Sequence, residues 1–198
     1  MPKQKPKLII VAGPNGSGKT TITEQGLAHQ WFDDCLYINP DNLAQEEFEG
    51  WNDKGSVLNA AKLATKMRYQ ALEEGRSIAF ETVFSSDEKI DFIVKAKELG
   101  YFVRVFFIST NSPKICASRI AQRVLQGGHE VPISKIVSRY SKSIVNAYKA
   151  INLSDRLYIY DNSVEDANPK LLARYSDGLI VKQYEEKLPE WGASLIKD

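Results

Sequence analysis

Residues 13–20 carry the most specific chemical pattern in the chain. They read GPNGSGKT and match the pattern GxxxxGK[ST] at every fixed position. Glycines let such a loop wrap closely around a phosphate, so that successive backbone N–H groups and the positive end of a following helix face the anion. The apolar run KLIIVA before the loop and the helical periodicity after it supply the strand and helix that the pattern requires. The sequence therefore predicts a phosphate-binding loop.

The residue types in this loop predict a nucleotide with its metal ion. Lys19 is placed to bridge the β- and γ-phosphates, and the Thr20 hydroxyl is a ligand for Mg²⁺. An accidental glycine-rich turn would not explain Lys and Thr in register after it. The predicted cofactors are ATP and Mg²⁺, and the predicted nucleotide contacts in the loop are Gly13, Pro14, Asn15, Gly16, Ser17, Gly18, Lys19, Thr20 and Thr21.

Acidic residues follow two of the predicted strands. Asp41 comes after the apolar run 35–38 in the sequence INPDN, and Glu81 ends the run SIAFE before Thr82. Ligands of open parallel sheets bind beyond the carboxyl ends of the strands, where Asp41 would accept a proton from an acceptor hydroxyl. Glu81 and Thr82 are predicted to contact the acceptor, or Glu81 to hold a metal-bound water. The alternatives are a helix N-cap for Asp41 and a purely structural strand end for Glu81.

Three arginines lie around a glycine pair in the second half of the chain. Arg119 and Arg123 are four residues apart on one predicted helix, and Arg139 follows the interruption GGHEVP on the next helix. Guanidinium groups suit the spread charge of a transferring phosphoryl group, so residues 115–140 are predicted to form a helical lid. His129 would contact a phosphate or substrate, or else cap the helix end. The alternative for each arginine is a solvated helix surface.

A polar segment, YDNS, follows the predicted strand 156–160. Asn162 is a predicted nucleotide contact, together with Arg119, because this loop lies on the same side of the sheet as the phosphate loop. Backbone groups here would hold the adenine. The alternative is an Asx or Ser cap for a following helix.

Strands and helices alternate along the sequence. Apolar runs predict strands at 7–12, 35–38, 77–83, 101–109, 156–160 and 178–181. Helical periodicity predicts helices from Gly18 to about 30, near Leu43, over 56–74, 86–99, 113–126, 132–151 and 164–173, and a final surface helix. This order predicts an α/β fold, a three-layer P-loop NTPase with a mostly parallel sheet. A length of 198 residues favours a single domain over 1–198, with a basic tail at 1–6.

The composition limits the classes of partner. The 26 Lys and Arg against 25 Asp and Glu leave no global field for a polyanion, so we expect no nucleic-acid partner. Cys35 and Cys116 lack the spacing of a metal knuckle or a disulfide framework, which fits a reducing cytoplasm. The chain has no apolar run near 18 residues and no signal-peptide pattern, so we expect no membrane partner and a cytoplasmic protein.

Taken together, the motifs GPNGSGKTT, INPDN, FETVFS, RVLQGGHEVP with SRYSKS, and YDNS resemble the zeta-toxin-like branch of P-loop kinases over about residues 7–163. The resemblance implies a five-stranded kinase-type sheet and transfer of phosphate from ATP, with Mg²⁺, to a hydroxyl of a small molecule. For characterised zeta toxins that molecule is UDP-N-acetylglucosamine. The segment after Glu81 reads TVFSS, where the toxins tend to carry Gly, Thr and a basic residue.

The resemblance also implies roles for single residues. Asp41 is the base, Lys19 and Thr20 hold phosphate and metal, and Arg123 and Arg139 serve the transferring phosphate, while Glu81 and Thr82 approach the acceptor. An antitoxin protein is a candidate partner on the same resemblance. The residues alone leave three readings open, namely a kinase, a P-loop ATPase that acts on a protein partner, and a non-catalytic nucleotide-binding module.

Overall fold

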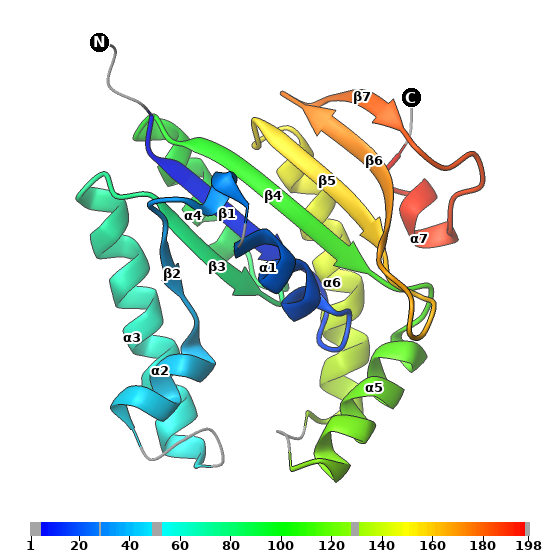
Figure 1. Cartoon of the computed structure of the whole chain (residues 1–198), viewed down its shortest axis with the longest axis horizontal. Helices are drawn as coiled ribbons and strands as arrows, with labels where there is room; N and C mark the ends of the chain where they lie inside the picture. The colour runs from blue at the N-terminus through cyan, green and yellow to red at the C-terminus, as the bar shows by residue number, and fades with distance from the viewer. Residues whose placement is uncertain (1–4, 28, 49–52, 128–130, 197–198) are drawn as a thin grey trace.

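A seven-stranded sheet forms the centre of the molecule (Figure 1). The computed structural model describes residues 5–27, 29–48, 53–127 and 131–196. The strand order is β2-β3-β1-β4-β5-β6-β7, and the first five strands run parallel while β6 and β7 run antiparallel to their neighbours. The strands are β1 (Lys7–Ala12), β2 (Leu36–Ile38), β3 (Ile78–Thr82), β4 (Phe102–Ser109), β5 (Arg156–Asp161), β6 (Lys170–Ser176) and β7 (Leu179–Gln183).

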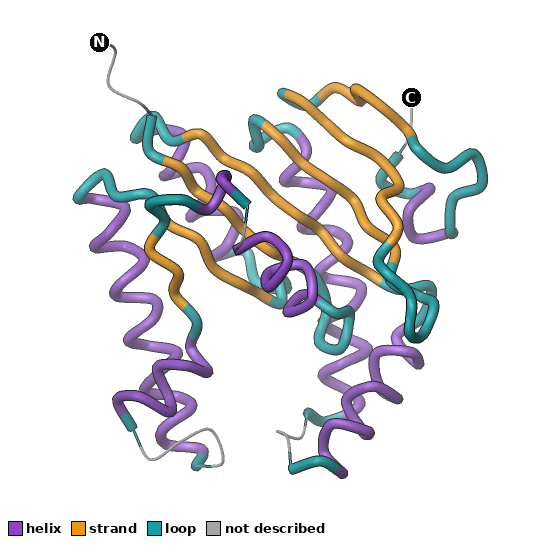
Figure 2. Tube along the Cα trace, viewed as in Figure 1, coloured by secondary structure: helices purple, strands orange, loops and turns teal. Residues whose placement is uncertain are grey.

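Helices cover both faces of the sheet, as the ribbon in Figure 1 and the tube in Figure 2 show. They are α1 (Lys19–Leu27), α2 (Pro40–Glu47), α3 (Lys54–Glu73), α4 (Glu88–Glu98), α5 (Pro113–Leu125), α6 (Ile133–Ile151) and α7 (Glu190–Ala193), with a short 3₁₀ helix, η1 (Gln30–Phe32). Figure 1 places α1 on one face and α4 and α6 on the other. The predicted α/β class with a mostly parallel sheet is therefore confirmed. Within the part of the chain that the structure describes, no helix is long and apolar enough to cross a membrane.

Strand β1 is buried on both faces because it lies in the middle of the sheet. Leu8 and Ile10 pack into the larger core with α3, α4 and α6, whereas Ile9 and Val11 pack on the opposite face with Phe32 of η1. Side chains alternate between the faces of a strand, so a strand covered on both sides must be apolar at every position. This is why the apolar run before the phosphate loop is uninterrupted from Leu8 to Ala12.

The end of the chain differs from the sequence prediction. The expected helix over 164–173 is wrong, because Lys170–Ser176 forms β6 and pairs antiparallel with β5. Leu172, Ala173 and Tyr175 of β6 reach the core, Tyr175 at 4% exposure. The family resemblance implied five strands and the apolar runs predicted six, of which the last, 178–181, corresponds to β7. With β6 the sheet has seven strands. The final helix, α7, is not a simple surface helix either, since Trp191 is buried in the core.

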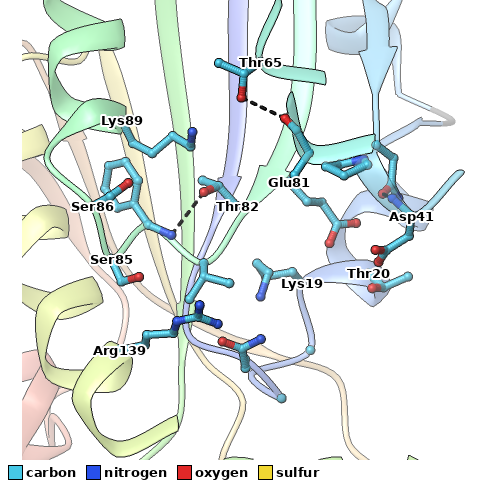
Figure 3. A pocket seen from close by; sticks show the side chains of 18 of the residues that line it. Lys19, Thr20, Asp41, Thr65, Glu81, Thr82, Ser85, Ser86, Lys89 and Arg139 are labelled. Carbon is cyan, nitrogen blue, oxygen red and sulfur yellow. Dashed lines mark hydrogen bonds between the residues drawn. The ribbon is translucent and has the colours of Figure 1, made fainter. Parts of the chain in front are cut away.

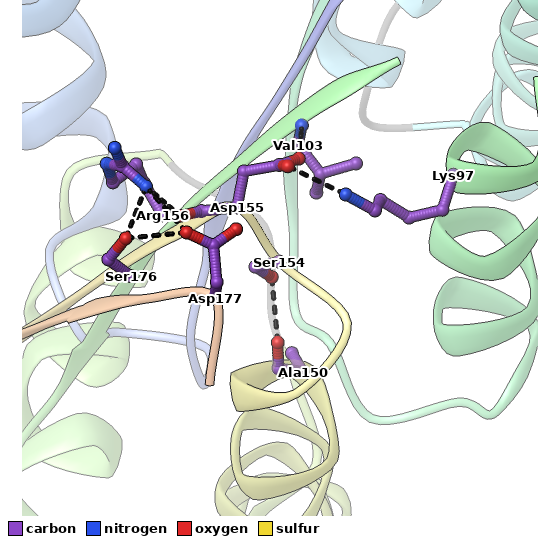
Figure 4. A network of polar contacts seen from close by, with 8 residues as sticks. All are labelled: Lys97, Val103, Ala150, Ser154, Asp155, Arg156, Ser176 and Asp177. Atoms are coloured by element: carbon purple, nitrogen blue, oxygen red, sulfur yellow. Dashed lines mark hydrogen bonds and ion pairs between the residues drawn. The ribbon is translucent and has the colours of Figure 1, made fainter. Parts of the chain in front are cut away.

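A polar network fixes the amino-terminal ends of β4 and β5 (Figure 4). The Asp155 carboxylate accepts from Val103 N at 2.7 Å and from Lys97 Nζ at 2.7 Å, and so joins β4, α4 and the start of β5. Next to it, Arg156 Nη1 lies 3.3 Å from Oδ2 of Asp177, at the turn between β6 and β7. These contacts secure the parallel strands at the end opposite to the phosphate loop.

Candidate functional site

The phosphate loop leaves β1 and turns directly into α1. Gly13 has a φ of 153°, and a Cβ there would lie 2.0 Å from the carbonyl oxygen of Ile108 in β4. Gly18 has a φ of 91°, and a Cβ there would lie 2.1 Å from Nδ2 of Asn162. Both positions require glycine, because positive φ disfavours other residues and because neighbouring atoms fill the space. The loop is thereby held close to β4 and to the segment after β5.

The loop has polar groups that fit a bound phosphate. The backbone N–H groups of Asn15, Gly16 and Gly18 have no hydrogen-bond partner among the described residues. The buried Oγ of Ser17 has none either. Buried polar groups are normally paired, and phosphate oxygens are acceptors for such N–H donors at the start of a helix. The residues of this loop therefore fit the phosphates of ATP.

Lys19 lies folded back into the loop. Its Nζ donates to Gly13 O at 3.0 Å and to Pro14 O at 2.9 Å. Burial lowers the pKa of Lys19 from 10.5 to about 8, while the nearby carboxylate of Glu81 acts in the opposite direction. A phosphate beside this amine would favour its charged form and raise the pKa again. The lysine is therefore placed to respond to an anion in the loop.

The donors around Thr20 fit Mg²⁺ that is shared with a nucleotide. Thr20 is exposed at the start of α1 and lines the same cleft as Asp41 and Glu81. No cluster of three or more His, Cys, Asp or Glu side chains that would hold a metal by itself occurs in the described ranges. Mg²⁺ at nucleotide sites is bound by one or two carboxylates together with phosphate oxygens and water. Thr20 with a neighbouring carboxylate matches that donor set.

Asp41 lies at the edge of the cleft, at the start of α2. The N-cap of this helix is Asn39, whose Oδ1 accepts from Asp41 N at 2.9 Å, and Pro40 occupies the first helical position. The Asp41 carboxylate is exposed and makes no hydrogen bond to any residue that the structure describes. The capping role that the sequence allowed for Asp41 therefore belongs to Asn39, and the Asp41 side chain is free to contact a ligand.

Glu81 is tied to β2 through a tyrosine that the sequence analysis did not single out. Tyr37 Oη donates to Glu81 Oε1 at 3.3 Å and accepts from Asn39 Nδ2 at 3.3 Å. Burial, followed by the Glu81 charge, raises the pKa of Tyr37 above its usual range. On the next residue, Thr82 Oγ1 accepts from Phe84 N at 3.2 Å. Tyr37 thus joins the end of β2 to Glu81 at the end of β3.

A cleft of about 570 Å³ brings the predicted residues together. Lys19, Asp41 and Glu81 line it from the strand ends, and Arg123 of α5 and Arg139 of α6 line it from the opposite helices. Figure 3 shows Lys19, Glu81 and Arg139 around this space. Five residues from five separate elements therefore meet at one edge of the sheet.

A second cavity of about 330 Å³ lies beside the loop, where the sequence placed the adenine. Gly18, Thr21, Arg119 and Asn162 line it. Arg119 Nη1 donates to Asn162 O at 2.8 Å, and Asn162 Nδ2 donates to Ser17 O at 2.8 Å. Arg119 therefore contacts Asn162 and lies apart from Arg139. Asn162 in turn contacts Ser17, so Arg119 and Asn162 together support the phosphate loop from its side.

The described residues of the segment predicted as a lid, 115–140, lie mainly in α5 and in the first part of α6. These helices share an apolar cluster of their own, which contains Cys116, Ile120, Ile136 and Tyr140. Tyr140 Oη donates to Thr110 O and so attaches α6 to the end of β4. His129, which the sequence analysis also placed in this segment, lies outside the described residues.

A sequence model of the family described as Zeta toxin matches residues 1–166. The chain belongs to the zeta toxin family. An uncharacterised protein of Haemophilus influenzae is 27% identical over 136 residues, which are 68% of this chain and 92% of that protein. The match to the family model ends at residue 166, before β6, so the antiparallel strands and α7 lie outside the part that this model covers.

Solved structures of other proteins share this fold. A structure of AvrRxo1-ORF1:-ORF2 with ATP has a TM-score of 0.67 and 18% identity, and the match covers 89% of this chain and 60% of that chain. The PezAT toxin-antitoxin system of Streptococcus pneumoniae has a TM-score of 0.61 and 19% identity, over 85% of this chain and 71% of that chain. This zeta toxin family member therefore has the fold of a P-loop kinase-type phosphotransferase, and it spans 60% of the first of these neighbours.

The structure adds residues to the cleft that the sequence analysis missed. Thr65 and Arg68 of α3, Ser85 and Ser86 of the segment after β3, and Lys89 of α4 line it. We call these five residues the acceptor wall. One signal was present, because Arg68 lies four residues after Ala64 and four before Leu72, both of which are buried. An arginine on the buried stripe of a helix is unusual and marks a position that needs a partner.

Proposed function

We propose that this protein is an ATP-dependent kinase that transfers the γ-phosphate of ATP to a hydroxyl of a small molecule. The observation that supports this proposal is that Lys19 and Asp41 meet in one cleft with Arg123 and Arg139, and that the Asp41 carboxylate has no hydrogen-bond partner among the described residues. Such a carboxylate beside a phosphate loop suits a general base. A hydrolase, whose acceptor is water, would not need the space that the cleft leaves between the strand ends and α3.

The proposed chemistry uses each of these groups once. The acceptor oxygen forms a bond to the γ-phosphorus, the bond from that phosphorus to the bridging oxygen breaks, and ADP leaves with the electron pair. Asp41 accepts the hydroxyl proton, while Lys19, Arg123 and Arg139 donate to phosphate oxygens whose charge shifts during transfer. Mg²⁺, held by Thr20 and the phosphates, supplies charge neutralisation when it is bound.

The finer part of the proposal concerns the acceptor, the partner and the location. The volume of the cleft, about 570 Å³, is in the usual range for small-molecule sites. A nucleotide sugar such as UDP-N-acetylglucosamine is our candidate acceptor, on the family alone. Because the PezAT neighbour is a toxin-antitoxin system, an antitoxin is a candidate protein partner. We also propose a cytoplasmic location, as the sequence analysis expected.

Transfer from γ-labelled ATP to a panel of nucleotide sugars, sugars and small alcohols tests the proposal, with Lys19→Ala as the inactive control. We expect Asp41→Asn to bind ATP with wild-type affinity but to lose about 10²- to 10⁴-fold in transfer rate. Glu46→Gln is the matched control, because Glu46 is an exposed carboxylate on the same helix and does not line the cleft. Full transfer by Asp41→Asn would remove Asp41 from the role of base. Release of free phosphate without any labelled acceptor would favour the ATPase reading.

A further inference from the structure

The acceptor wall carries two cations that the proposed phosphate chemistry does not use. Three cations of the cleft, Lys19, Arg123 and Arg139, are assigned to the phosphates of the nucleotide. Arg68 and Lys89 line the same cleft but come from α3 and α4. These two cations require another explanation.

Figure 3 labels part of this wall. Lys89, Ser85 and Ser86 are on one side of the cleft, and Thr20 and Asp41 are on the other. An acceptor with its hydroxyl at Asp41 therefore extends toward Lys89 and the serines.

Arg68 is a buried guanidinium with unused donors. Its side chain lies over the Phe80 ring at 4.9 Å, and Nη2 donates to Thr65 Oγ1 at 2.8 Å. The residue is only 5% exposed, and none of its other N–H groups has a hydrogen-bond partner among the residues described. Those nitrogens are not enclosed by protein, because Arg68 borders the cleft. A fixed guanidinium with free donors matches the geometry of a phosphate or carboxylate.

Lys89 is the second cation of the wall, and a neighbouring carboxylate partly offsets its charge. Its Nζ forms an ion pair with Oε2 of Glu88, and its side chain is 13% exposed. The other oxygen, Glu88 Oε1, is buried without a hydrogen-bond partner in the described ranges. Glu88 is the main charge that opposes the lowering of the Arg68 pKa by burial. Glu88 therefore offsets one of the two cations, and one positive charge on this wall stays unbalanced.

A strained turn holds the serines of the wall in place. Phe84 has a φ of 61° and is fully buried, a conformation that bulky residues rarely adopt. Asn146 of α6 stabilises the turn, because its Nδ2 donates to Phe84 O at 3.1 Å and to Ser86 O at 3.2 Å. Backbone strain of this kind persists where the surrounding structure enforces it, often beside a ligand. The wall is therefore preorganised next to the cleft.

We propose that Arg68 and Lys89, with the hydroxyls of Ser85 and Ser86, form an anion subsite, so that the acceptor carries a phosphate or carboxylate group besides its reacting hydroxyl. This inference rests on the proposed kinase function. Binding of that group fixes the acceptor with its hydroxyl toward Asp41, and neutral sugars and alcohols lack the group that the wall recognises.

Binding of inorganic phosphate tests the subsite without any transfer reaction. Isothermal titration uses protein saturated with Mg²⁺ and a non-hydrolysable ATP analogue, so that the phosphate loop is filled. The test variant is Glu88→Gln with Lys89→Gln, which removes both partners of one ion pair and leaves the net charge unchanged. The control is Glu73→Gln with Lys95→Gln, which removes the exposed 3.0 Å pair between α3 and α4, away from the cleft.

We expect the Glu88 and Lys89 variant to bind phosphate about tenfold or more weakly than the wild type, and the control to bind normally. Arg68→Lys keeps the charge but loses the fork of donors, and we expect an intermediate loss. No phosphate binding by the wild type, or equal binding by the wild type and the Glu88 and Lys89 variant, would overturn the subsite.

Paired acceptors then identify the anion and separate this inference from the kinase proposal. The pairs are glycerol with glycerol 3-phosphate or glycerate, and N-acetylglucosamine with its 1-phosphate or its uridine diphosphate ester. We expect labelling of charged members only, and about a tenfold higher KM for them in the Glu88 and Lys89 variant with an unchanged KM for ATP. Equal labelling of a neutral member would overturn the subsite. Phosphate binding that depends on Lys89, without labelling of any compound, would uphold the subsite and count against the kinase.

Discussion

Replacing Gly18 with alanine tests how the phosphate loop is supported from its side. The added Cβ would lie 2.1 Å from Asn162 Nδ2, at a residue whose φ is 91°. The same amide donates to Ser17 O at 2.8 Å. Alanine therefore strains its own backbone and displaces the side chain that holds the loop.

The cost follows from these two effects. A left-handed backbone costs a non-glycine residue about 1–2 kcal/mol, and the lost hydrogen bond with the displaced amide adds about 1–2 kcal/mol. We expect Gly18→Ala to lower the free energy of unfolding by about 2–4 kcal/mol and Asn162→Ala to lower it by about 1 kcal/mol. The double variant loses the Asn162 contact only once. Its cost is therefore about 1–2 kcal/mol smaller than the sum of the single costs.

Urea unfolding of the four proteins measures this coupling, and titration with MgATP shows whether the loop still binds nucleotide. Gly75→Ala is the matched control, because Gly75 has a φ of 69° and a Cβ there meets nothing within 4 Å. It should cost only the backbone strain, about 1–2 kcal/mol. If the Gly18 and Asn162 costs add to within about 0.5 kcal/mol, the contact does not carry the effect and the reasoning is refuted.

Three other substitutions separate stability from function. Burial lowers the Lys19 pKa to about 8, so the unfolded chain holds this proton more tightly than the folded protein does. We therefore expect Lys19→Met to raise the free energy of unfolding by about 2–3 kcal/mol at pH 7, and this gain to decline between pH 8 and 10.5. Urea titrations at several pH values measure it. Asn146→Ala removes both hydrogen bonds to the Phe84 turn, and we expect a loss of about 1–3 kcal/mol in urea unfolding, with a KM that rises for the acceptor and not for ATP in steady-state kinetics. Asp155→Ala should also cost about 1–3 kcal/mol but leave ATP affinity unchanged in a binding titration, because its network lies at the opposite strand ends.

Local patterns were sufficient for the parallel part of the fold. The apolar run of β1, the glycine loop and the start of α1 are contiguous, so their chemistry is readable without tertiary contacts. The long helices were also predictable, since their periodicity extends over many turns. Asp41 and Glu81 were found because strand ends meet at one edge of a parallel sheet. Their catalytic roles stay predictions.

Other features depended on contacts between distant segments. The segment Lys170–Ser176 has no strong local preference, and pairing with β5 made it a strand instead of a helix. Asn39 and Asp41 are both good capping residues, and only the backbone geometry decided that Asn39 caps α2. Arg68 was not singled out in the sequence, although it lies on the buried stripe of its helix, because the cleft that it shares with Lys89 of another helix forms only in the folded protein.

The sequence by itself determined the α/β class, the zeta toxin family and the phosphate loop, because these depend on residues that are neighbours in the chain or on the periodicity of one element. Only the tertiary structure decided which side chains share the cleft, that Asn162 supports the loop, and that Arg68 and Lys89 line the cleft together. Those relations join β1, α3, α4 and the segment after β5, which are far apart in sequence. Their contacts follow from how the sheet and helices pack, and no local pattern encodes that packing.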